Sequence, residues 1–440
     1  MKTILFLVVG LLATFPTKAA DEQPAPLTAD ATLEKQIVSA VKQLSAAKAA
    51  DRDAAEKELL ELAGNTTTDT DRFLALLPKD NDQMPLALRD RLSRIRKQIE
   101  DRTAKVATNG TKITLSAKEM PLKDVLKSIE QQTGNKLVDS RDDDPDFKGA
   151  SITIELKDEP FWSAVDKILD QVQLSINNVG GEAALSLVPR GNGVRPRVGS
   201  AVYEGPFRIE ATQVEADRNL RQSSEATLKL QFEVGWEPRL PPIALSQPPG
   251  DVHATTDNGT ALIITQPDAL QDVEVTAGTQ GAEIVLPLSL PDRQAKKIAS
   301  LKGTLHALVP GRHAKFQFEK FTKSIGKSQE LGGVRITLDD VKKNGAVWEV
   351  HVRFALGENS TSLQNHRDWV LQNLSYLVDE HGRHIENAGF EMTRQTATEV
   401  GVAYFFDVTQ DLDALAWVYE TPAAIVDLPV SYELKDIELP

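Results

Sequence analysis

The chain has 440 residues, of which 26% are charged and 41% hydrophobic, and its formal net charge at pH 7 is −14. At about 150 residues per domain, this length predicts roughly three folded units, each large enough to bury its own core. The acidic balance argues against a nucleic acid as partner, because that binding rests on clustered positive charge. The sequence contains no cysteine, which excludes thiol nucleophiles, cysteine-bound zinc, iron–sulfur clusters and disulfide frameworks.

Residues 1–20 have the pattern of a signal peptide. Lys2 precedes an apolar run at residues 4–15, and the segment ends in small residues. The run is too short to cross a bilayer, which takes a helix of about 20 apolar residues. We therefore expect export to a bacterial periplasm or the extracellular space, no transmembrane segment in the mature chain, and a short linker at 21–30.

Residues 31–107 are predicted to form a helical segment. Leu33, Ile37 and Val41 follow one another at intervals of four, which places them on one helical face. The stretch ADRDAAEKELLELAG, within residues 34–64, is similar to the second helix of HEAT-like repeats. A single repeat of that kind cannot bury its own faces, so we favour a helical bundle or spacer.

Residues 112–190 carry a strand–helix pattern that occurs twice. In its first occurrence a strand leads through Pro121 into an amphipathic helix that stops at Gly134. In its second, a strand leads through Pro160 into another helix, and a turn at Gly180–Gly181 joins two final strands. The predicted order of elements is βαβ followed by βαββ.

This doubled unit resembles the short N-terminal domain that secretins share with signalling TonB-dependent receptors. The resemblance covers about 80 of the 440 residues. It implies a periplasmic protein-interaction module without catalytic residues. Nothing downstream resembles a secretin ring domain, so the resemblance does not imply that this chain forms pores or takes part in siderophore-type signalling. The residues that match the family pattern are Pro121, Leu122, Val125, Leu126, Gln132, Thr133, Gly134, Val165, Asp166, Ile168, Leu169 and Leu174, whereas Gln173 stands where glycine is usual.

The chain beyond residue 200 is predicted to be antiparallel β structure. Apolar and polar residues alternate most clearly over 227–236, and Asn344-Gly345 predicts a hairpin turn between two strands. Residues 237–251 hold five prolines, so we expect a connection or an edge strand there rather than a central strand.

The predicted fold is therefore multi-domain α+β, with an N-terminal helical segment, a small βαβ-βαββ module and a C-terminal antiparallel β-sandwich region. The β region is read either as a pair of sandwiches or as one large β domain over 201–440. The expected units are the signal peptide (1–20), a linker (21–30), the helical segment (31–107), the α/β module (112–190), a second linker (191–200), a β-sandwich (201–310) and a second β-sandwich (311–440).

The sequence predicts no catalytic, cofactor or metal site. It contains no nucleophile elbow, no Walker loop and no dinucleotide-binding glycine motif. His381 and His384 lie three residues apart, but their Asp-Glu-His-Gly context is typical of a turn, and a metal would need further ligands. We therefore expect a protein that is not an enzyme.

The densest group of carboxylates lies in the α/β module. It comprises Asp139, Asp142, Asp143, Asp144 and Asp146. Calcium takes six to eight oxygen ligands, but the spacing is not that of an EF-hand, and a solvated acidic loop is the favoured interpretation. A basic protein partner is the other reason to consider this loop as a binding surface.

Trp162 is the candidate binding anchor. It lies one position off the apolar stripe of its predicted helix, so we expect it to be partly exposed, and exposed tryptophans often anchor interfaces. The preferred hypothesis is a non-enzymatic cell-envelope scaffold or adaptor that contacts another envelope protein. The alternatives are a carbohydrate- or polymer-binding protein that uses the sandwiches, and a hydrolase with an unrecognised site.

Overall fold

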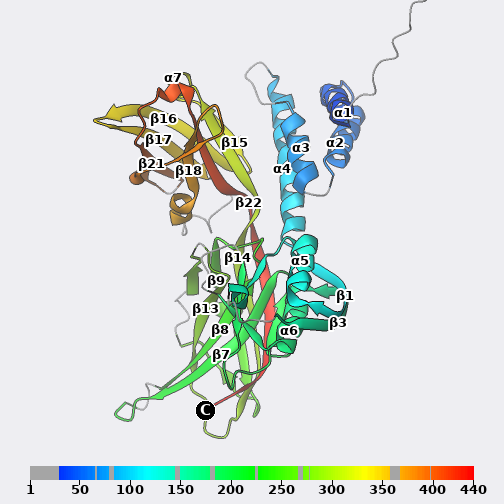
Figure 1. Cartoon of the computed structure of the whole chain (residues 1–440), viewed down its shortest axis with the longest axis vertical. Coiled ribbons are helices and arrows are strands. Elements are labelled where there is room, and N and C mark those ends of the chain that lie inside the picture. Colours follow the sequence, from blue (N-terminus) through cyan, green and yellow to red (C-terminus); the bar gives the residue numbers. More distant parts are fainter. Residues whose placement is uncertain are drawn as a thin grey trace, which may run out of the picture.

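A computed structural model of the chain describes residues 29–64, 67–78, 84–143, 149–178, 184–222, 226–265, 271–276, 278–356, 367–396 and 398–440. Within these ranges the fold is multi-domain α+β, as predicted (Figure 1). The proposed signal peptide, most of the linker at 21–30 and the turn at Gly180–Gly181 lie outside the described residues.

The N-terminal helices form a unit with its own core, which we call the helical unit. Ile37 from the first helix and Leu44, which directly follows it, join Leu59 from the second helix and Ile95 from the fourth in one cluster, and each of these side chains is at most 2% exposed. Burial of such side chains contributes about 1.5–3 kcal/mol each. The elements are α1 (Ala29–Gln43), α2 (Ala49–Leu62), α3 (Thr67–Leu76) and α4 (Leu86–Ala107).

The α/β module packs both of its helices between a pair of small sheets. One sheet pairs β1 with β3, and the other has the order β2-β5-β4. Both helices begin directly after a proline, and α5 ends at Gly134 in the left-handed conformation. The elements are β1 (Lys112–Pro121), α5 (Leu122–Thr133), β2 (Leu137–Asp139), β3 (Ser151–Pro160), α6 (Phe161–Gln171), β4 (Leu174–Asn177) and β5 (Leu185–Pro189).

The strand–helix repeat predicted from the sequence is a structural repeat with an offset of 39 residues, as Pro121 and Pro160 illustrate. Glu119 and Asp158, at equivalent positions, both have positive φ, 50° and 53°. Gly134 and Gln173, also equivalent, have φ of 72° and 56°. The position where the secretin-type pattern expects glycine therefore needs left-handed backbone, and Gln173 adopts it.

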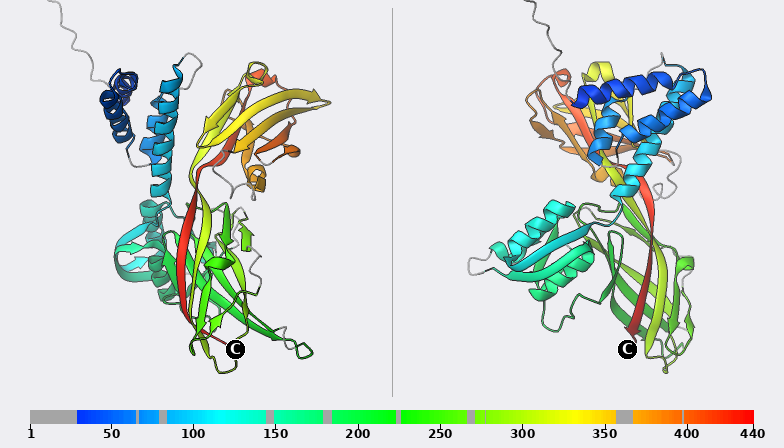
Figure 2. Two further views of the ribbon diagram at one scale, coloured as in Figure 1. Left: turned by 180° about the vertical axis from the view of Figure 1, so that it is seen from behind. Right: turned by 90° about the vertical axis from the view of Figure 1, so that its right-hand side faces the viewer.

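Beyond the module, a long pair of antiparallel strands runs through the whole β region. These strands, β14 (Lys297–Glu319) and β22 (Ala416–Glu438), are 23 residues long and stay paired from Lys297–Glu438 to Glu319–Ala416. We call this pair the central ribbon. Figure 2 shows it passing from one end of the β region to the other.

At one end of the central ribbon lies the proximal sandwich, in which the sheet β13-β8-β7-β6 packs on the ribbon. The strands β9, β10, β11 and β12 extend the ribbon's own sheet. The strand bounds are β6 (Ala201–Glu204), β7 (Phe207–Arg218), β8 (Ala226–Trp236), β9 (Ala244–Gln247), β10 (His253–Thr256), β11 (Ala261–Leu262), β12 (Gln271–Glu274) and β13 (Gly281–Ser289), with a 3-10 turn, η2 (Pro249–Asp251).

The prediction that residues 237–251 hold no central strand is wrong for β9. This strand pairs with β12 on one side and with β14 on the other. Its four residues lie between Pro242 and Pro248, so none of the five prolines removes a hydrogen bond from the ladder.

At the other end lies the distal sandwich, in which the sheet β15-β16-β17-β21-β20 packs on the ribbon with β18 and β19. The predicted hairpin turn at Asn344-Gly345 is confirmed, because it joins β16 to β17 with Gly345 at φ 62°. The bounds are α7 (Phe321–Ser324), β15 (Ser328–Leu331), β16 (Val334–Asn344), β17 (Val347–Leu356), η3 (Arg367–Gln372), β18 (Leu374–Val378), β19 (His384–Glu386), β20 (Gly389–Gln395), β21 (Glu399–Phe406) and η4 (Leu412–Ala414).

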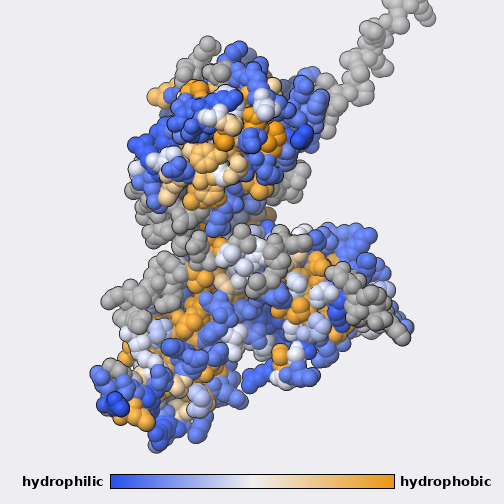
Figure 3. Space-filling view, turned by 60° about the vertical axis from the view of Figure 1, so that its left-hand side comes forward, coloured by the Kyte–Doolittle hydropathy of each residue, from blue (hydrophilic) through white to orange (hydrophobic). Residues whose placement is uncertain are grey.

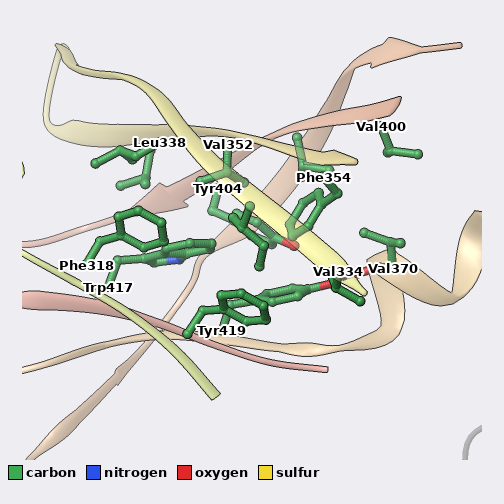
Figure 4. Packing of buried hydrophobic residues seen from close by; sticks show 14 of the residues in the cluster. Phe318, Val334, Leu338, Val352, Phe354, Val370, Val400, Tyr404, Trp417 and Tyr419 are labelled. Carbon is green, nitrogen blue, oxygen red and sulfur yellow. Dashed lines mark hydrogen bonds between the residues drawn. The ribbon is translucent and has the colours of Figure 1, made fainter. Parts of the chain in front are cut away.

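Aromatic side chains fill the core of the distal sandwich (Figure 4). Trp417 and Tyr419 stack with ring centroids 5.8 Å apart, and Tyr404 packs against both. The Trp417 indole N–H donates to Ser375 Oγ at 2.9 Å, and the Tyr419 hydroxyl donates to the Val370 carbonyl at 2.8 Å. The polar ends of both rings are thus satisfied while their apolar faces stay buried.

The sandwiches meet at a waist formed by residues 310–312 and 423–425 of the central ribbon. Figure 3 shows the molecule narrowing between its upper and lower parts. The boundary predicted between the two β-sandwiches, at residues 310/311, falls inside β14. The second half of β22 returns to the proximal sandwich. Helix α4 packs against the ribbon here, and the Arg312 guanidinium lies 2.6 Å from the Glu100 carboxylate. Burial raises the pKa of Glu100, despite that cation.

A side chain at Gly311 is expected to push α4 off the waist. A Cβ there would lie 2.2 Å from the Ala104 Cβ and 2.7 Å from the Ala424 carbonyl oxygen. We expect Gly311→Val to lower the free energy of unfolding by about 1–3 kcal/mol and to speed amide exchange in α4. The matched control is Gly250→Val, whose Cβ would meet no atom within 4 Å and should change stability by less than about 0.5 kcal/mol. Equal urea midpoints for the two variants would contradict this.

Candidate interaction surface of the module

Trp162 is buried, so the expectation that it is a partly exposed anchor is wrong. Its side chain is 2% exposed, and its indole N–H donates to the Pro206 carbonyl at 2.8 Å. Its ring also lies 3.5 Å from where a Cβ on Gly235 would stand. The residue that lies off the apolar stripe of α6 is therefore covered by the proximal sandwich of the same chain.

The acidic run is only partly described by the structure. Asp139 is 4% exposed, and its carboxylate accepts from Arg141 at 2.7 Å, so it is a locally paired group rather than a free acid. Asp142 and Asp143 lie in a short 3-10 helix, η1 (Ser140–Asp143). Asp144 and Asp146 fall outside the described residues.

No metal centre is evident where the structure describes the chain. Within that part, no group of three or more His, Asp or Glu side chains is arranged to hold an ion. His381 lies on an exposed turn that Asp379 closes by accepting from the His381 and Arg383 amides at 2.9 Å. His384 stacks instead on the Tyr376 ring, with centroids 4.2 Å apart.

Asp166 is the centre of the contact that fixes the module to the proximal sandwich. Its side chain is fully buried, and its Oδ1 accepts from Arg197 Nε at 2.7 Å. Its Oδ2 accepts from Arg208 Nε at 2.8 Å and from the Tyr203 hydroxyl at 2.9 Å. Burial would lower the pKa of Arg208, but the carboxylates of Asp166 and Glu210 raise it above its usual value. The guanidinium therefore stays charged inside the contact.

Asp170, one turn further along α6, holds the segment expected to be a linker. Its Oδ1 accepts from the Arg197 amide at 2.8 Å and its Oδ2 from the Val198 amide at 2.9 Å. The Arg190 side chain donates to Asp170 as well and to the Leu174 carbonyl. Burial would raise the pKa of Asp170, yet these hydrogen bonds lower it. Residues 191–200 are thus tied down on α6.

Glu237 forms a second buried contact, on the other side of the module. Its carboxylate is fully buried and accepts from the Thr111 amide at 2.7 Å and from the Asn135 side chain at 2.9 Å. Arg239 donates to Glu237 Oε2 at 2.8 Å and to the Ala107 carbonyl, at the end of α4, at 2.6 Å. Glu237 and Arg239 together therefore join the helical unit, the α/β module and the proximal sandwich.

The first repeat of the module presents the equivalent helix face to solvent. The residues 39 positions before Trp162, Asp166 and Asp170 are Lys123, Lys127 and Gln131 of α5, and all of them are exposed. Neither lysine forms an ion pair or a side-chain hydrogen bond with a described residue. We call this the α5 face. It differs from the α6 face in charge, because lysines replace the tryptophan and the first aspartate.

Glutamine side chains bond one amide in each strand of the β1–β3 sheet. The Thr114 amide donates to Gln132 Oε1 at 3.0 Å, and the equivalent Thr153 amide donates to Gln171 Oε1 at 3.3 Å. Both threonines lie at register shifts between β1 and β3. These contacts belong to the repeat, because Gln132 and Gln171 are related by the same 39-residue offset.

The sandwiches offer no exposed tryptophan among the described residues that could serve as a sugar platform. Trp236 and Trp417 are fully buried, Trp369 is 7% exposed, and Trp348 is partly covered beneath Lys343. These positions agree with packing roles.

The chain matches no protein-family model, and comparisons with curated proteins and with solved structures find no match. Among the described residues, no helix has the length and apolar character needed to cross a membrane. The functional interpretation therefore rests on the sequence of this chain and on the contacts described above. Sequence reasoning missed Asp166, Asp170 and Glu237 as contact residues. For Asp166 and Asp170, the sequence signal was the repeat with its 39-residue offset. The position equivalent to Asp166 in the first repeat is Lys127, which has the opposite charge.

Proposed function

We propose that this chain is an exported, non-enzymatic protein of the bacterial cell envelope that works as a scaffold or adaptor through protein–protein contact. The proposal rests on a difference between the equivalent faces of α5 and α6. The α6 face binds the proximal sandwich through Trp162 and Asp166 and the segment 191–200 through Asp170, whereas the equivalent α5 face is exposed. The signal-peptide pattern at residues 1–20 and the likeness to a periplasmic interaction module support the location.

The rigid attachment of the module supports a presenting role. The carboxylates of Asp166 and Glu237 are fully buried and paired, and breaking such a pair typically costs several kcal/mol. A module held in this way offers the α5 face in a fixed orientation relative to the sandwiches. A fixed orientation lowers the entropic cost of binding a partner.

The charge of the α5 face selects the kind of partner. Lys123 and Lys127 stand one turn apart and have no acidic partner among the described residues. By comparison, the acidic α6 face binds the basic side chains of Arg197 and Arg208. Complementary charge across an interface steers encounter and disfavours wrong partners. We therefore expect an acidic segment of an envelope protein on the α5 face.

Charge reversal on the α5 face is expected to abolish partner capture. With the tagged full chain as bait in an envelope extract, Lys123→Glu/Lys127→Glu should reduce the enrichment of the main partner at least about tenfold, equivalent to about 1.4 kcal/mol. The readout is quantitative mass spectrometry.

The matched control is Lys118→Glu/Lys157→Glu, which reverses an exposed pair related by the same 39-residue offset. This control should capture the partner as well as the unmodified chain does. Equal loss in both variants, or no loss in either, would argue against the α5 face. Failure of the unmodified chain to enrich any envelope protein would argue against the adaptor function itself.

A further inference from the structure

A cleft opens at the base of the proximal sandwich, far along the chain from the α/β module. Its volume is about 480 Å³, within the range of small-molecule sites, about 300–1,000 Å³. It is bounded by the end of β7, the start of β8, the connection from β13 to β14 and the residues that follow β22. Its lining residues are Ala216, Arg218, Leu228, Leu290, Pro291, Asp292, Arg293, Ala295, Lys296, Leu439 and Pro440.

The floor of the cleft is apolar. Leu228 is 1% exposed and Ala295 7%. Leu290 and Leu439 are half-buried and pack against the same core cluster. The Leu439 amide donates to the Lys296 carbonyl at 2.9 Å, which fixes one wall of the cleft to another. The floor is therefore continuous with the core of the proximal sandwich and is held by backbone hydrogen bonds.

The rim of the cleft is cationic. Arg218, Arg293 and Lys296 line it, are exposed and form no ion pair or side-chain hydrogen bond with any residue that the structure describes. The acid of the rim, Asp292, is already engaged, because its Oδ1 accepts from the Gln294 amide at 2.8 Å and the Ala295 amide at 3.2 Å.

Asp257 and Asp436, which lie near the rim, are also engaged. Asp257 accepts from the Lys296 amide at 3.2 Å, and Asp436 pairs with Lys297. The cleft therefore places three cationic side chains that have no described ionic partner beside an apolar floor.

We propose that this cleft binds a small amphiphilic anion, with the alkyl chain on the apolar floor and the anionic head among Arg218, Arg293 and Lys296. The chemistry shared by the candidate ligands is a carboxylate or phosphate head on a single alkyl chain. Arginine suits such heads because its planar fork donates to a pair of oxygens at once. The proposal is independent of the α5 face and of partner binding.

Calorimetric titration of the full chain below the micelle concentration tests this site. Dodecanoate and dodecyl phosphate are the anionic probes and separate a carboxylate from a phosphate head, acetate supplies a head without a chain, and dodecyl maltoside supplies a chain without charge. We expect saturable binding of at least one anionic probe, no binding of acetate, and at least about tenfold weaker binding of the maltoside.

The variants then locate the site. Arg293→Glu should weaken binding of the anionic probe at least about tenfold, whereas Arg383→Glu, the same charge change on an exposed turn of the distal sandwich, should leave it unchanged. Ala216→Trp, which fills the cleft from an exposed position, should abolish binding without altering the melting temperature. Equal binding of the maltoside, or an anionic affinity that survives both cleft variants, would overturn the proposal.

Discussion

Replacing Asp166 by alanine is expected to lower the free energy of unfolding by about 3–5 kcal/mol, because it removes a buried carboxylate shared by two guanidinium groups and leaves Arg208 with Glu210 as its remaining ionic partner. Arg208 would stay 2% exposed with its Asp166 partner gone, and Arg197 would lose its contact at 2.7 Å. Urea denaturation measures the loss, and amide exchange should speed up in 191–208.

The matched control for this variant is Asp158→Asn, which removes the charge but keeps a side chain that tolerates the left-handed backbone at this position, where φ is 53°. Asp158 pairs with Lys112 at 3.1 Å on the exposed side of the same module, and an exposed pair of this kind contributes about 0–1 kcal/mol. If Asp166→Ala were no more destabilising than Asp158→Asn, the contact between α6 and the proximal sandwich would not be what holds the module.

Replacing Glu237 by alanine should have an effect of similar size, about 3–5 kcal/mol, but over a wider part of the molecule. The Thr111 amide and the Asn135 side chain would both lose a buried acceptor. Arg239, which also reaches the Ala107 carbonyl, would lose the carboxylate that orients it. Calorimetry should show a lower melting temperature, and amide exchange should speed up in the last turn of α4 as well as in the module.

Glu283→Ala is the control for the Glu237 variant, because Glu283 is exposed on the neighbouring strand β13 and should change stability by less than about 0.5 kcal/mol. Amide exchange should also distinguish the two variants, because Asp166→Ala should leave the exchange rates at the end of α4 unchanged. A Glu237 variant that loosened only the module would contradict its role as a three-way contact.

The elements of the α/β module could be predicted because their signals are local. Pro121 and Pro160 each precede a helix with an apolar stripe, and Gly134 ends the first helix, as expected. These residues act through their own backbone conformation, which needs no knowledge of distant parts of the chain.

The contacts between units could not be predicted in the same way. Trp162 looks exposed when only the stripe of its own helix is counted, yet Pro206, 44 residues later, accepts its hydrogen bond. Asp166 and Asp170 look like the polar face of an amphipathic helix. Periodicity shows which face of an element is polar, but it does not show what other part of the chain covers that face.

The central ribbon has a consequence for the order in which the protein assembles. Lys297 of β14 pairs with Glu438 of β22, and Val430, Tyr432 and Leu434 belong to the proximal core. During synthesis, that core stays incomplete until β22 has emerged, although most of its strands precede residue 310. Contacts of such long sequence separation form slowly. Until β22 has emerged, the edge of β14 and the apolar side chains of the proximal core remain open, so the nascent chain is most exposed to aggregation in the interval between the synthesis of β14 and that of β22.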